Sequence, residues 1–253
     1  MTARIIAVTN QKGGVAKTTT AVNVLAAFAQ MGRRCLLVDI DPQGNASVSS
    51  GVSINQVEDG VYGVLMGDAN IKDEIVSSKN GYDILPASPD LAGAQVELLS
   101  FKDKDFRLRK ALAKVAKNYD VILIDTPPSL NVLTINALSA ATDVLIPVQC
   151  EYFALEGLSG LITTMGRVRQ ALNPKLSILG VVRTMYDGRN SLTIEVSRQL
   201  TKHFQEKVFK TLIPRNVRLA EAPSHGLSVL AYDKSCRGAQ AYIALAQEIL
   251  AKK

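Results

Sequence analysis

Residues 11–20 read Gln11-Lys12-Gly13-Gly14-Val15-Ala16-Lys17-Thr18-Thr19-Thr20, and they follow the apolar run Ile5–Val8. A segment with helical spacing, 17–31, continues from them and stops at Gly32. Between a strand and a helix, glycines let the backbone curl so that successive N–H groups point at one phosphate, and the helix N-terminus adds partial positive charge. The stretch therefore predicts a phosphate-binding loop.

The side chains of this loop suit nucleotide binding. Lys17 can reach the β- and γ-phosphates of ATP, and Thr18 can give its hydroxyl oxygen to Mg²⁺. The strict pattern GxxxxGK followed by Ser or Thr is not matched, because Gln11 and Ala16 stand where it has glycine. The deviant pattern KGGxxK followed by Ser or Thr is matched, and its additional lysine, Lys12, can point away from its own loop. The predicted nucleotide-binding residues of the loop are Lys12, Gly13, Gly14, Val15, Ala16, Lys17, Thr18 and Thr19.

Acidic residues follow two further apolar runs. Asp39 and Asp41 come at the end of the run Cys35–Val38, and Asp125 comes directly after Val121–Ile124. Carboxylates at strand ends beside a phosphate loop can hold Mg²⁺ through its waters and orient an attacking water molecule. An aspartate after an apolar strand is often a helix cap, but three of them in a chain with a phosphate loop favour a functional site.

Apolar runs alternate with segments of helical period throughout the chain, which indicates a mostly parallel sheet covered on both faces. No linker rich in Pro, Gly or Ser divides residues 1–253. The sequence therefore predicts one α/β domain, a P-loop NTPase built on a single doubly wound, mostly parallel β-sheet with helices on both faces. Residues 42–80 are expected to be an excursion from the sheet. The remaining predicted strands are 82–85, 144–148 and 176–182, and the remaining predicted helices are 106–118, 155–172, 192–204 and 238–250.

Composition excludes several classes of protein. Apolar residues make up 47% of the chain and charged residues 21%, which suits a large buried core and argues against wholesale disorder. No secretory cleavage site and no apolar run of roughly 18 residues is present, so neither export nor a membrane span is expected. Cys35, Cys150 and Cys236 form no metal-ligand pattern and are expected to be ordinary thiols in a reducing cytosol. The sequence predicts a cytoplasmic protein.

The net charge of +6 is unevenly distributed along the chain. Residues 1–166 hold 14 Lys/Arg and 17 Asp/Glu, a net charge of −3, whereas residues 167–253 hold 15 Lys/Arg and 6 Asp/Glu, a net charge of +9. Such asymmetry indicates a face that binds a polyanion, built from the C-terminal third of the chain. A solvated basic surface that binds nothing is the alternative that charge alone leaves open.

Taken together, these motifs resemble the partition ATPases of the ParA/Soj type, in the wider group that includes MinD and the nitrogenase iron protein. The last of the matching stretches, which reads Ile-Pro-Arg-Asn-Val-Arg-Leu-Ala-Glu-Ala-Pro-Ser-His-Gly, is characteristic of the ParA/Soj branch. The matching stretches are 12–20, 39–45, 125–129, 147–157, 184–190 and 213–226.

The resemblance implies roles for particular residues. Lys12 is similar to the signature lysine that crosses a dimer interface to the partner's nucleotide, and Asp41 to the aspartate needed for hydrolysis. Asp125 is similar to the carboxylate that holds Mg²⁺ through its water shell. The expected catalytic residues are thus Lys12, Lys17 and Asp41, and the expected metal residues are Thr18, Asp41 and Asp125. The expected adenine contacts are Pro214, Arg215 and Asn216, and the expected DNA contacts are Arg189 and Arg218.

The resemblance also implies a cycle. An ATPase of this type dimerises on Mg-ATP, binds double-stranded DNA without sequence preference, and is released when a ParB-type partner stimulates slow hydrolysis. One departure is Ala16, where the family usually has glycine. Ala at positive φ costs roughly 1–2 kcal/mol, and because Ala16 immediately precedes the helix, a negative φ is expected there.

Other functions fit the sequence less well. A MinD-like membrane ATPase needs a C-terminal amphipathic anchor, but here the chain end continues a core-like helix. An iron–sulfur carrier needs converging cysteines, and Cys150 has no suitable second cysteine nearby in the sequence. The set Lys17, Asp41 and Asp125 argues against a non-catalytic regulator, and a GTPase is disfavoured because no NKxD-type motif is present. The cargo, whether chromosome, plasmid or another body, is left open.

Overall fold

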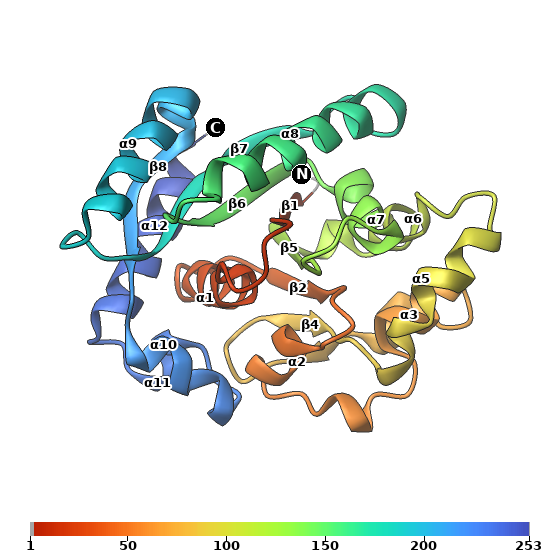
Figure 1. Cartoon of the computed structure of the whole chain (residues 1–253). Coiled ribbons are helices and arrows are strands. Elements are labelled where there is room, and N and C mark those ends of the chain that lie inside the picture. The colour runs from red at the N-terminus through yellow and green to blue at the C-terminus, as the bar shows by residue number, and fades with distance from the viewer. Residues whose placement is uncertain (1–2, 253) are drawn as a thin grey trace.

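A computed structural model describes residues 3–252 of the chain. One eight-stranded sheet runs through it, in the order β3-β4-β2-β5-β1-β6-β7-β8 (Figure 1). Every neighbouring pair is parallel except β3 with β4, which is antiparallel. The strands are β1 (Arg4–Val8), β2 (Cys35–Asp39), β3 (Val76–Ser77), β4 (Asp83–Leu85), β5 (Val121–Asp125), β6 (Asp143–Gln149), β7 (Ser177–Tyr186) and β8 (Val208–Pro214).

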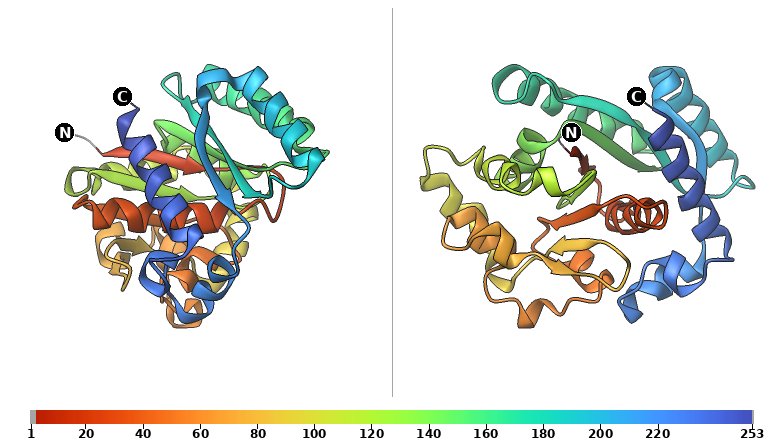
Figure 2. Two further views of the ribbon diagram at one scale, coloured as in Figure 1. Left: turned by 90° about the vertical axis from the view of Figure 1, so that its left-hand side faces the viewer. Right: turned by 180° about the vertical axis from the view of Figure 1, so that it is seen from behind.

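Helices cover both faces of the sheet, which confirms the predicted doubly wound α/β fold. Helices α1 and α12 pack against each other, and α12 also lies along β8 (Figure 2). The helices are α1 (Lys17–Gln30), α2 (Asn45–Ser49), α3 (Gly60–Met66), α4 (Ile71–Glu74), α5 (Ala94–Glu97), α6 (Arg107–Ala113), α7 (Val132–Ala140), α8 (Ala154–Ala171), α9 (Ser191–Phe204), α10 (Val217–Glu221), α11 (Val229–Tyr232) and α12 (Arg237–Ala251).

Successive side chains along each strand point to opposite faces of the sheet, so the hydrophobic core has two halves, one on each face. In β5, Ile122 and Ile124 face the layer of α3, α6, α7 and α8, whereas Val121 and Leu123 face the layer of α1 and α12. All five residues of β5 are buried, as expected for a central strand covered on both faces. Within residues 3–252, no helix combines the length and the hydropathy that crossing a bilayer requires.

The predicted elements are present, with differences that have physical causes. The predicted helix 106–118 ends early, since α6 stops at Ala113 and a 3₁₀ turn, Ala116–Asn118, follows. The strand β7 continues to Tyr186, four residues past its predicted end. The sequence patterns did not predict α7, whose residues are buried nearly all round and so lack amphipathic spacing, nor the edge strand β8, whose apolar run is interrupted by Lys210 and Thr211.

The segment 42–80, which leaves the sheet after β2, returns to it at β3. Hydrogen bonds and a close backbone contact join this segment to the C-terminal third of the chain. The Asn80 side chain accepts a hydrogen bond from Ser228 N (2.7 Å) and donates to Ser49 O (3.3 Å). At Gly226, φ is 65° and an added Cβ would lie 2.7 Å from Gly51 Cα. This close approach needs glycine, and it sets the segment 213–226 beside the carboxyl ends of the central strands.

Candidate functional site

The phosphate loop joins β1 to α1 at the middle of the sheet. Contacts to the two neighbouring strands on one side, β6 and β7, hold its backbone in place. Asn10 Nδ2 donates to Pro147 O (2.8 Å), while Asn10 Oδ1 accepts from Lys12 N (3.0 Å). Thr184 Oγ1, from β7, donates to Val15 O (3.0 Å). The loop is therefore shaped by the protein itself, as a preorganised anion cradle requires.

The prediction of a negative φ at Ala16 is wrong. Its φ is 65°, in the left-handed region, and Gly14 also has a positive φ, of 73°. The prediction rested on the nearness of α1, but Ala16 is the N-cap residue and lies outside the helical backbone. Its carbonyl oxygen already accepts the first helical hydrogen bond, from Thr20 N (2.9 Å). The loop thus carries a strained alanine where glycine would be relaxed.

The side chains of the two loop lysines lie on opposite sides of the loop. Lys17 is buried, and its Nζ donates to Lys12 O (3.2 Å) inside the loop. Burial lowers the pKa of Lys17, and the carboxylates of Asp125 and Asp41 oppose that change. Lys12 Nζ instead lies 2.8 Å from Glu151 Oε2, outside the loop. The structure therefore assigns Lys17 to the loop's interior and leaves Lys12 on its outer side.

Asp125 lies under the start of α1, since it ends β5 beside Val8 of β1. Thr18 Oγ1 donates to Asp125 Oδ2 (2.7 Å), so the hydroxyl keeps its lone pairs for another ligand. The other oxygen of Asp125, Oδ1, is buried without a hydrogen-bond partner among residues 3–252. Burial, reinforced by the neighbouring Asp39, raises the pKa of Asp125 well above its usual range.

The two aspartates after β2 have different surroundings, although the sequence grouped them together. Asp39 is fully buried and accepts hydrogen bonds from Ser47 N and Ser47 Oγ (both 2.7 Å) and from Asp41 N (3.2 Å). Burial raises the pKa of Asp39 to about 6. Asp41 lines the cavity above the loop, and its Oδ1 accepts from Gln43 N (3.0 Å). Asp39 thus holds α2 and the backbone of Asp41, and Asp41 faces the cavity.

The donor set suits Mg²⁺ held together with phosphate. Within residues 3–252, no three His, Cys, Asp or Glu side chains gather into a metal cage. Mg²⁺ keeps several waters and takes one or two protein oxygens beside substrate phosphates. The hydroxyl of Thr18 and the buried, unpartnered oxygen of Asp125 fit that mode of binding. The cavity, of about 500 Å³, is lined in part by Gly13, Gly14, Lys17, Thr18 and Asp41.

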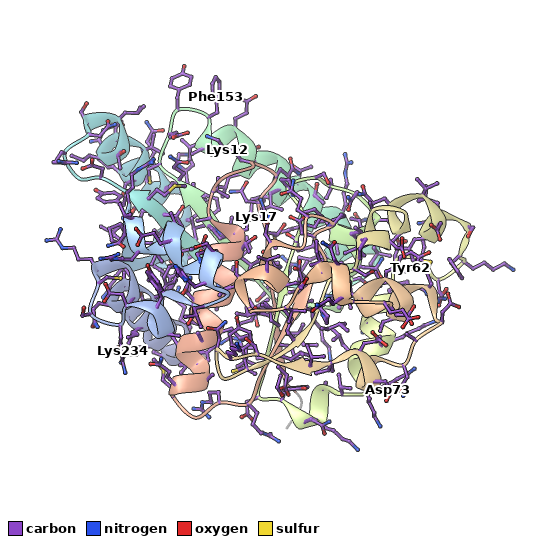
Figure 3. The ribbon with its side chains drawn as sticks, turned by 90° about the horizontal axis from the view of Figure 1, so that it is seen from below. Lys12, Lys17, Tyr62, Asp73, Phe153 and Lys234 are labelled. Carbon is purple, nitrogen blue, oxygen red and sulfur yellow. The ribbon has the colours of Figure 1, made fainter. Side chains whose placement is uncertain are left out.

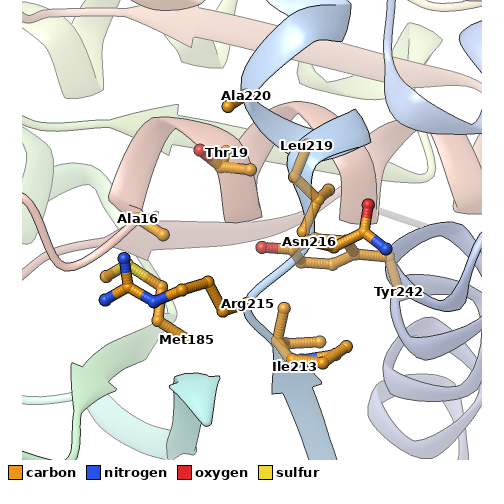
Figure 4. A pocket seen from close by; sticks show the side chains of 10 residues that line it. Ala16, Thr19, Met185, Ile213, Arg215, Asn216, Leu219, Ala220 and Tyr242 are labelled. Atoms are coloured by element: carbon orange, nitrogen blue, oxygen red, sulfur yellow. The ribbon is translucent and has the colours of Figure 1, made fainter. Parts of the chain in front are cut away.

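A second, mostly apolar cavity of about 200 Å³ adjoins the first and shares Ala16, Thr19 and Met185 with it (Figure 4). Its walls include the three predicted adenine contacts, Pro214, Arg215 and Asn216, and also Ile213, Leu219 and Tyr242. A polar cavity over a phosphate loop beside an apolar cleft matches the two ends of a nucleotide. Six loop residues, Asp41 and the segment 214–216 line these two cavities; the six are Gly13, Gly14, Ala16, Lys17, Thr18 and Thr19. Asp125 lies buried beneath the larger cavity and reaches it through Thr18, while Lys12 and Val15 do not line either one.

The two arginines predicted to contact DNA lie apart from these cavities. Arg189, just before α9, forms two hydrogen bonds to Asp187, yet 91% of its side chain is exposed. Arg218, on α10, contacts Glu221 (2.8 Å) and Asp233 (3.5 Å) and is half exposed. Neither arginine lines the nucleotide cavities.

Sequence reasoning assigned no role to Met185, Thr184 or Tyr242. Met185 has a φ of 48° and lines both cavities. Tyr242 closes the apolar cleft from α12, with its hydroxyl 3.2 Å from Thr20 Oγ1. Met185 and Thr184 fall within the stretch 184–190 that matched the family, and that match is the sequence feature from which a role in the site could have been predicted. No sequence feature predicted a role for Tyr242, because its spacing is that of any apolar, core-facing position in an amphipathic helix.

A parallel sheet with a phosphate loop after its first strand, and aspartates at the ends of the adjacent strands, defines a P-loop ATPase. The family model described as "AAA domain" matches residues 3–178. The sporulation initiation inhibitor protein Soj of Bacillus subtilis is 53% identical over 249 residues, which cover 98% of both chains. The chromosome partitioning protein ParA of Caulobacter vibrioides is 51% identical over 253 residues, covering 99% of this chain and 95% of that protein. The chain belongs to the ParA/Soj family of chromosome-partitioning ATPases.

A solved structure with this fold contains nucleotide and metal. The cobyrinic acid a,c-diamide synthase of Mycobacterium smegmatis with bound ADP and magnesium has a TM-score of 0.87 and 39% identity. The match covers 98% of this chain and 94% of that one. The activity in its name is that of the Mycobacterium protein, and the partition proteins are more similar in sequence to this chain.

The left-handed alanine yields a prediction about stability. Ala16→Gly should relieve a cost of roughly 1–2 kcal/mol, and glycine's extra freedom in the unfolded chain should take back about 0.4–1 kcal/mol of that gain. We expect a net stabilisation of up to about 1.6 kcal/mol, measured as a higher urea midpoint at unchanged slope. The control Ala244→Gly, at an exposed position in the middle of α12, should instead destabilise by about 0.5–1 kcal/mol. Equal losses in both variants would contradict strain at Ala16.

Proposed function

We propose that this chain works as a nucleotide-controlled DNA partition switch in the cytoplasm, associated with the nucleoid. In this proposal it is a single ATPase domain that binds Mg-ATP, dimerises on it, and binds double-stranded DNA non-specifically as the dimer. A ParB-type partner stimulates hydrolysis and so releases it, which segregates chromosome or plasmid DNA. The observation that carries the proposal is the separation of the two lysines: Lys17 serves the loop, whereas Lys12 lies outside it against Glu151.

Several contacts support ATP and Mg²⁺ as the ligands. The triphosphate would lie over the loop, where the buried Lys17 would neutralise part of its charge, and the base would enter the apolar cleft beside Asn216. Thr18 and Asp125 would hold Mg²⁺, directly and through water respectively, and the ion would neutralise charge on the phosphates. The related Mycobacterium structure, which contains ADP and magnesium, is consistent with this assignment.

Hydrolysis would depend on Asp41. One of its oxygens is engaged by Gln43 N, and the other, Oδ2, accepts no hydrogen bond from the residues that the structure describes. Because Asp41 lines the phosphate cavity, that oxygen could orient a water molecule there, while Asp39 fixes the backbone of Asp41. Phosphoryl transfer relies mainly on such positioning. Intrinsic turnover is expected to be slow, because the DNA-bound state must last until the partner arrives.

Asp41→Ala should therefore keep ATP binding while turnover falls by roughly 10²–10⁴-fold, the usual contribution of a positioned acid–base group. Binding would be measured with a fluorescent ATP analogue and turnover by phosphate release. Asp90→Ala, which changes an exposed aspartate on another element, should behave like the wild type. Normal turnover by Asp41→Ala would refute the assignment.

Dimerisation is supported by the surroundings of Gly13. Its φ is not in the left-handed region, and a Cβ added there would have no atom within 4 Å in its own protomer. Glycine at this exposed position is thus not required by the fold of one chain. It leaves room for a second backbone to approach closely, next to the lysine that the resemblance directs to a partner's nucleotide.

Gly13→Val should fold and bind nucleotide but remain a monomer. Light scattering with a non-hydrolysable ATP analogue should report a dimer for the wild type and for the control Gly166→Val, whose added side chain also has open space. The variant should bind the fluorescent analogue within a few-fold of the wild type. A Gly13→Val dimer of wild-type affinity would contradict the proposed interface.

DNA binding is supported by the charge of the C-terminal third and by the exposure of Arg189. One basic face makes few phosphate contacts, and two faces joined by ATP double their number, so affinity should rise steeply on dimerisation. Contacts to phosphates carry no sequence information, which explains binding to any duplex. A membrane role is less well supported, because the apolar face of α12, including Tyr242, Leu245 and Ile249, is packed into the core.

Arg189→Ala should weaken binding to two unrelated duplexes alike and flatten the salt dependence by about 0.9 in log–log slope per lost phosphate contact. Arg218→Ala should act in the same direction, and both variants should still dimerise. Arg34→Ala is a matched control, because Arg34 is also exposed and paired with an aspartate, Asp120, but precedes β2 and so lies at the amino ends of the strands, whereas Arg189 and Arg218 follow the carboxyl ends of β7 and β8. Fluorescence anisotropy with and without ATP is the measurement. Strong preference for one duplex, or equal binding without ATP, would overturn the DNA assignment.

A further inference from the structure

Two neighbouring aromatic side chains project into solvent at the start of α8. Tyr152 and Phe153 are 76% and 62% exposed, and they are the exposed aromatic residues of the part of the chain that the structure describes. Their rings are packed edge to face, with centroids 5.1 Å apart and planes at 90°. The two rings are therefore already arranged as a unit, although neither is covered.

The backbone that carries these rings is held in place. Ala154 N donates to Glu151 O (2.9 Å), and Thr193 Oγ1, from α9, donates to Cys150 O (3.4 Å). Cys150 itself is buried. The aromatic pair thus stands on a fixed turn between β6 and α8, and its exposure does not come from a loose loop.

The aromatic pair adjoins the outer side of the phosphate loop. Lys12 Nζ contacts the carboxylate of Glu151, the residue just before Tyr152. Further along α8, the side chain of Gln11 lies against Gly160, where an added Cβ would be 3.1 Å from Gln11 Oε1. In Figure 3, Phe153 projects from the outline of the molecule, and Lys12 lies between it and Lys17 in that view. The rings and the outer lysine therefore belong to one continuous face.

We propose that Tyr152 and Phe153 form the apolar centre of the face on which a second copy of this chain docks when ATP is bound. The inference rests on the proposed ATP-dependent dimer and names the surface that stabilises it. In a two-fold dimer each chain contributes the same patch. Aromatic residues are enriched at the centres of interfaces, with polar residues around them. Glu151 and Lys12 are the polar neighbours of the two rings on this face.

The size and charge of the patch favour a second copy over other occupants. A buried aromatic side chain covers about 150–250 Å², and Tyr152 and Phe153 are 76% and 62% exposed, so the four rings would supply roughly 400–700 Å² of a standard interface of about 1,600 Å². In the single chain Lys12 and Glu151 neutralise each other, so this pair adds no net charge to the face as two copies approach, before Lys12 turns to the partner's nucleotide. Glu151 and the exposed Glu156 disfavour an anionic lipid surface beside the rings.

Phe153→Trp gives a direct test, because the chain contains no tryptophan. With a non-hydrolysable ATP analogue, the introduced indole should show blue-shifted emission and lower acrylamide quenching at protein concentrations where light scattering reports the dimer. Both changes should disappear on dilution to monomer and in the Gly13→Val background. A dimer in which the indole stays fully quenchable would overturn this inference and leave the proposed dimer standing.

A second measurement separates contact from stability. The double change Tyr152→Ser with Phe153→Ser should raise the dimer dissociation constant at least tenfold, with unchanged melting temperature and unchanged affinity of the monomer for the ATP analogue. The control, Val96→Ser with Leu99→Ser, removes apolar side chains of similar exposure from another surface and should have no effect. A wild-type chain that stays monomeric with ATP would remove the proposed dimer and this inference together. A blue shift seen only with lipid vesicles or with a partner protein, and never with ATP alone, would also overturn the inference.

Discussion

The hydrogen bond from Thr184 Oγ1 to Val15 O (3.0 Å) links the phosphate loop to β7, and the geometry of the nucleotide site depends on it. Val15 lies between two residues of positive φ, Gly14 and Ala16, so its carbonyl points away from the space where phosphate would lie. A buried carbonyl needs a donor, and Thr184 is fully buried beside it. The next residue, Met185, takes a left-handed backbone and lines both cavities. Strain at Ala16 and at Met185 is thus concentrated where this one bond joins the two segments, as is common at functional sites.

Electrostatics under the loop depends on the order of the central strands. Because β5 lies between β2 and β1, Asp39 and Asp125 are neighbours across the sheet. Burial and the neighbouring carboxylate of Asp39 raise the pKa of Asp125, and its unpartnered oxygen adds to the cost of ionising it. A cation arriving at Thr18 favours the ionised form of Asp125. The charged form of Lys17 is favoured by an anion instead, because burial lowers the pKa of Lys17 and a nearby phosphate would offset that effect. Nucleotide and metal would each supply the charge that the buried groups lack.

Much of this arrangement could be predicted from local sequence, and the rest could not. The apolar runs and the glycine-rich loop predict the sheet, the loop and the acidic strand ends, because each is a property of a few consecutive residues. The distinction between Asp39 and Asp41 could not be predicted, since it depends on Ser47, which α2 brings back to the end of β2. The backbone at Ala16 was predicted wrongly, because the contact that holds it comes from a residue 168 positions later in the chain. Tyr242 likewise joins the site only through the packing of α12 on α1.

The chain order of the strands also has a consequence for synthesis of the protein on the ribosome. The loop is made almost first, yet β1 ends up between β5 and β6, and most of the wall of the apolar cleft comes from residues between 213 and 242. Domains emerge from their N-termini at about 5–20 residues per second, and contacts distant in sequence form late. A growing chain would therefore expose its loop before Asn216 and Tyr242 exist to accompany it. A partly synthesised chain could bind phosphate at the loop but would lack the apolar surface for a base. Binding of a whole nucleotide would therefore begin only after the C-terminal helix has been synthesised and packed.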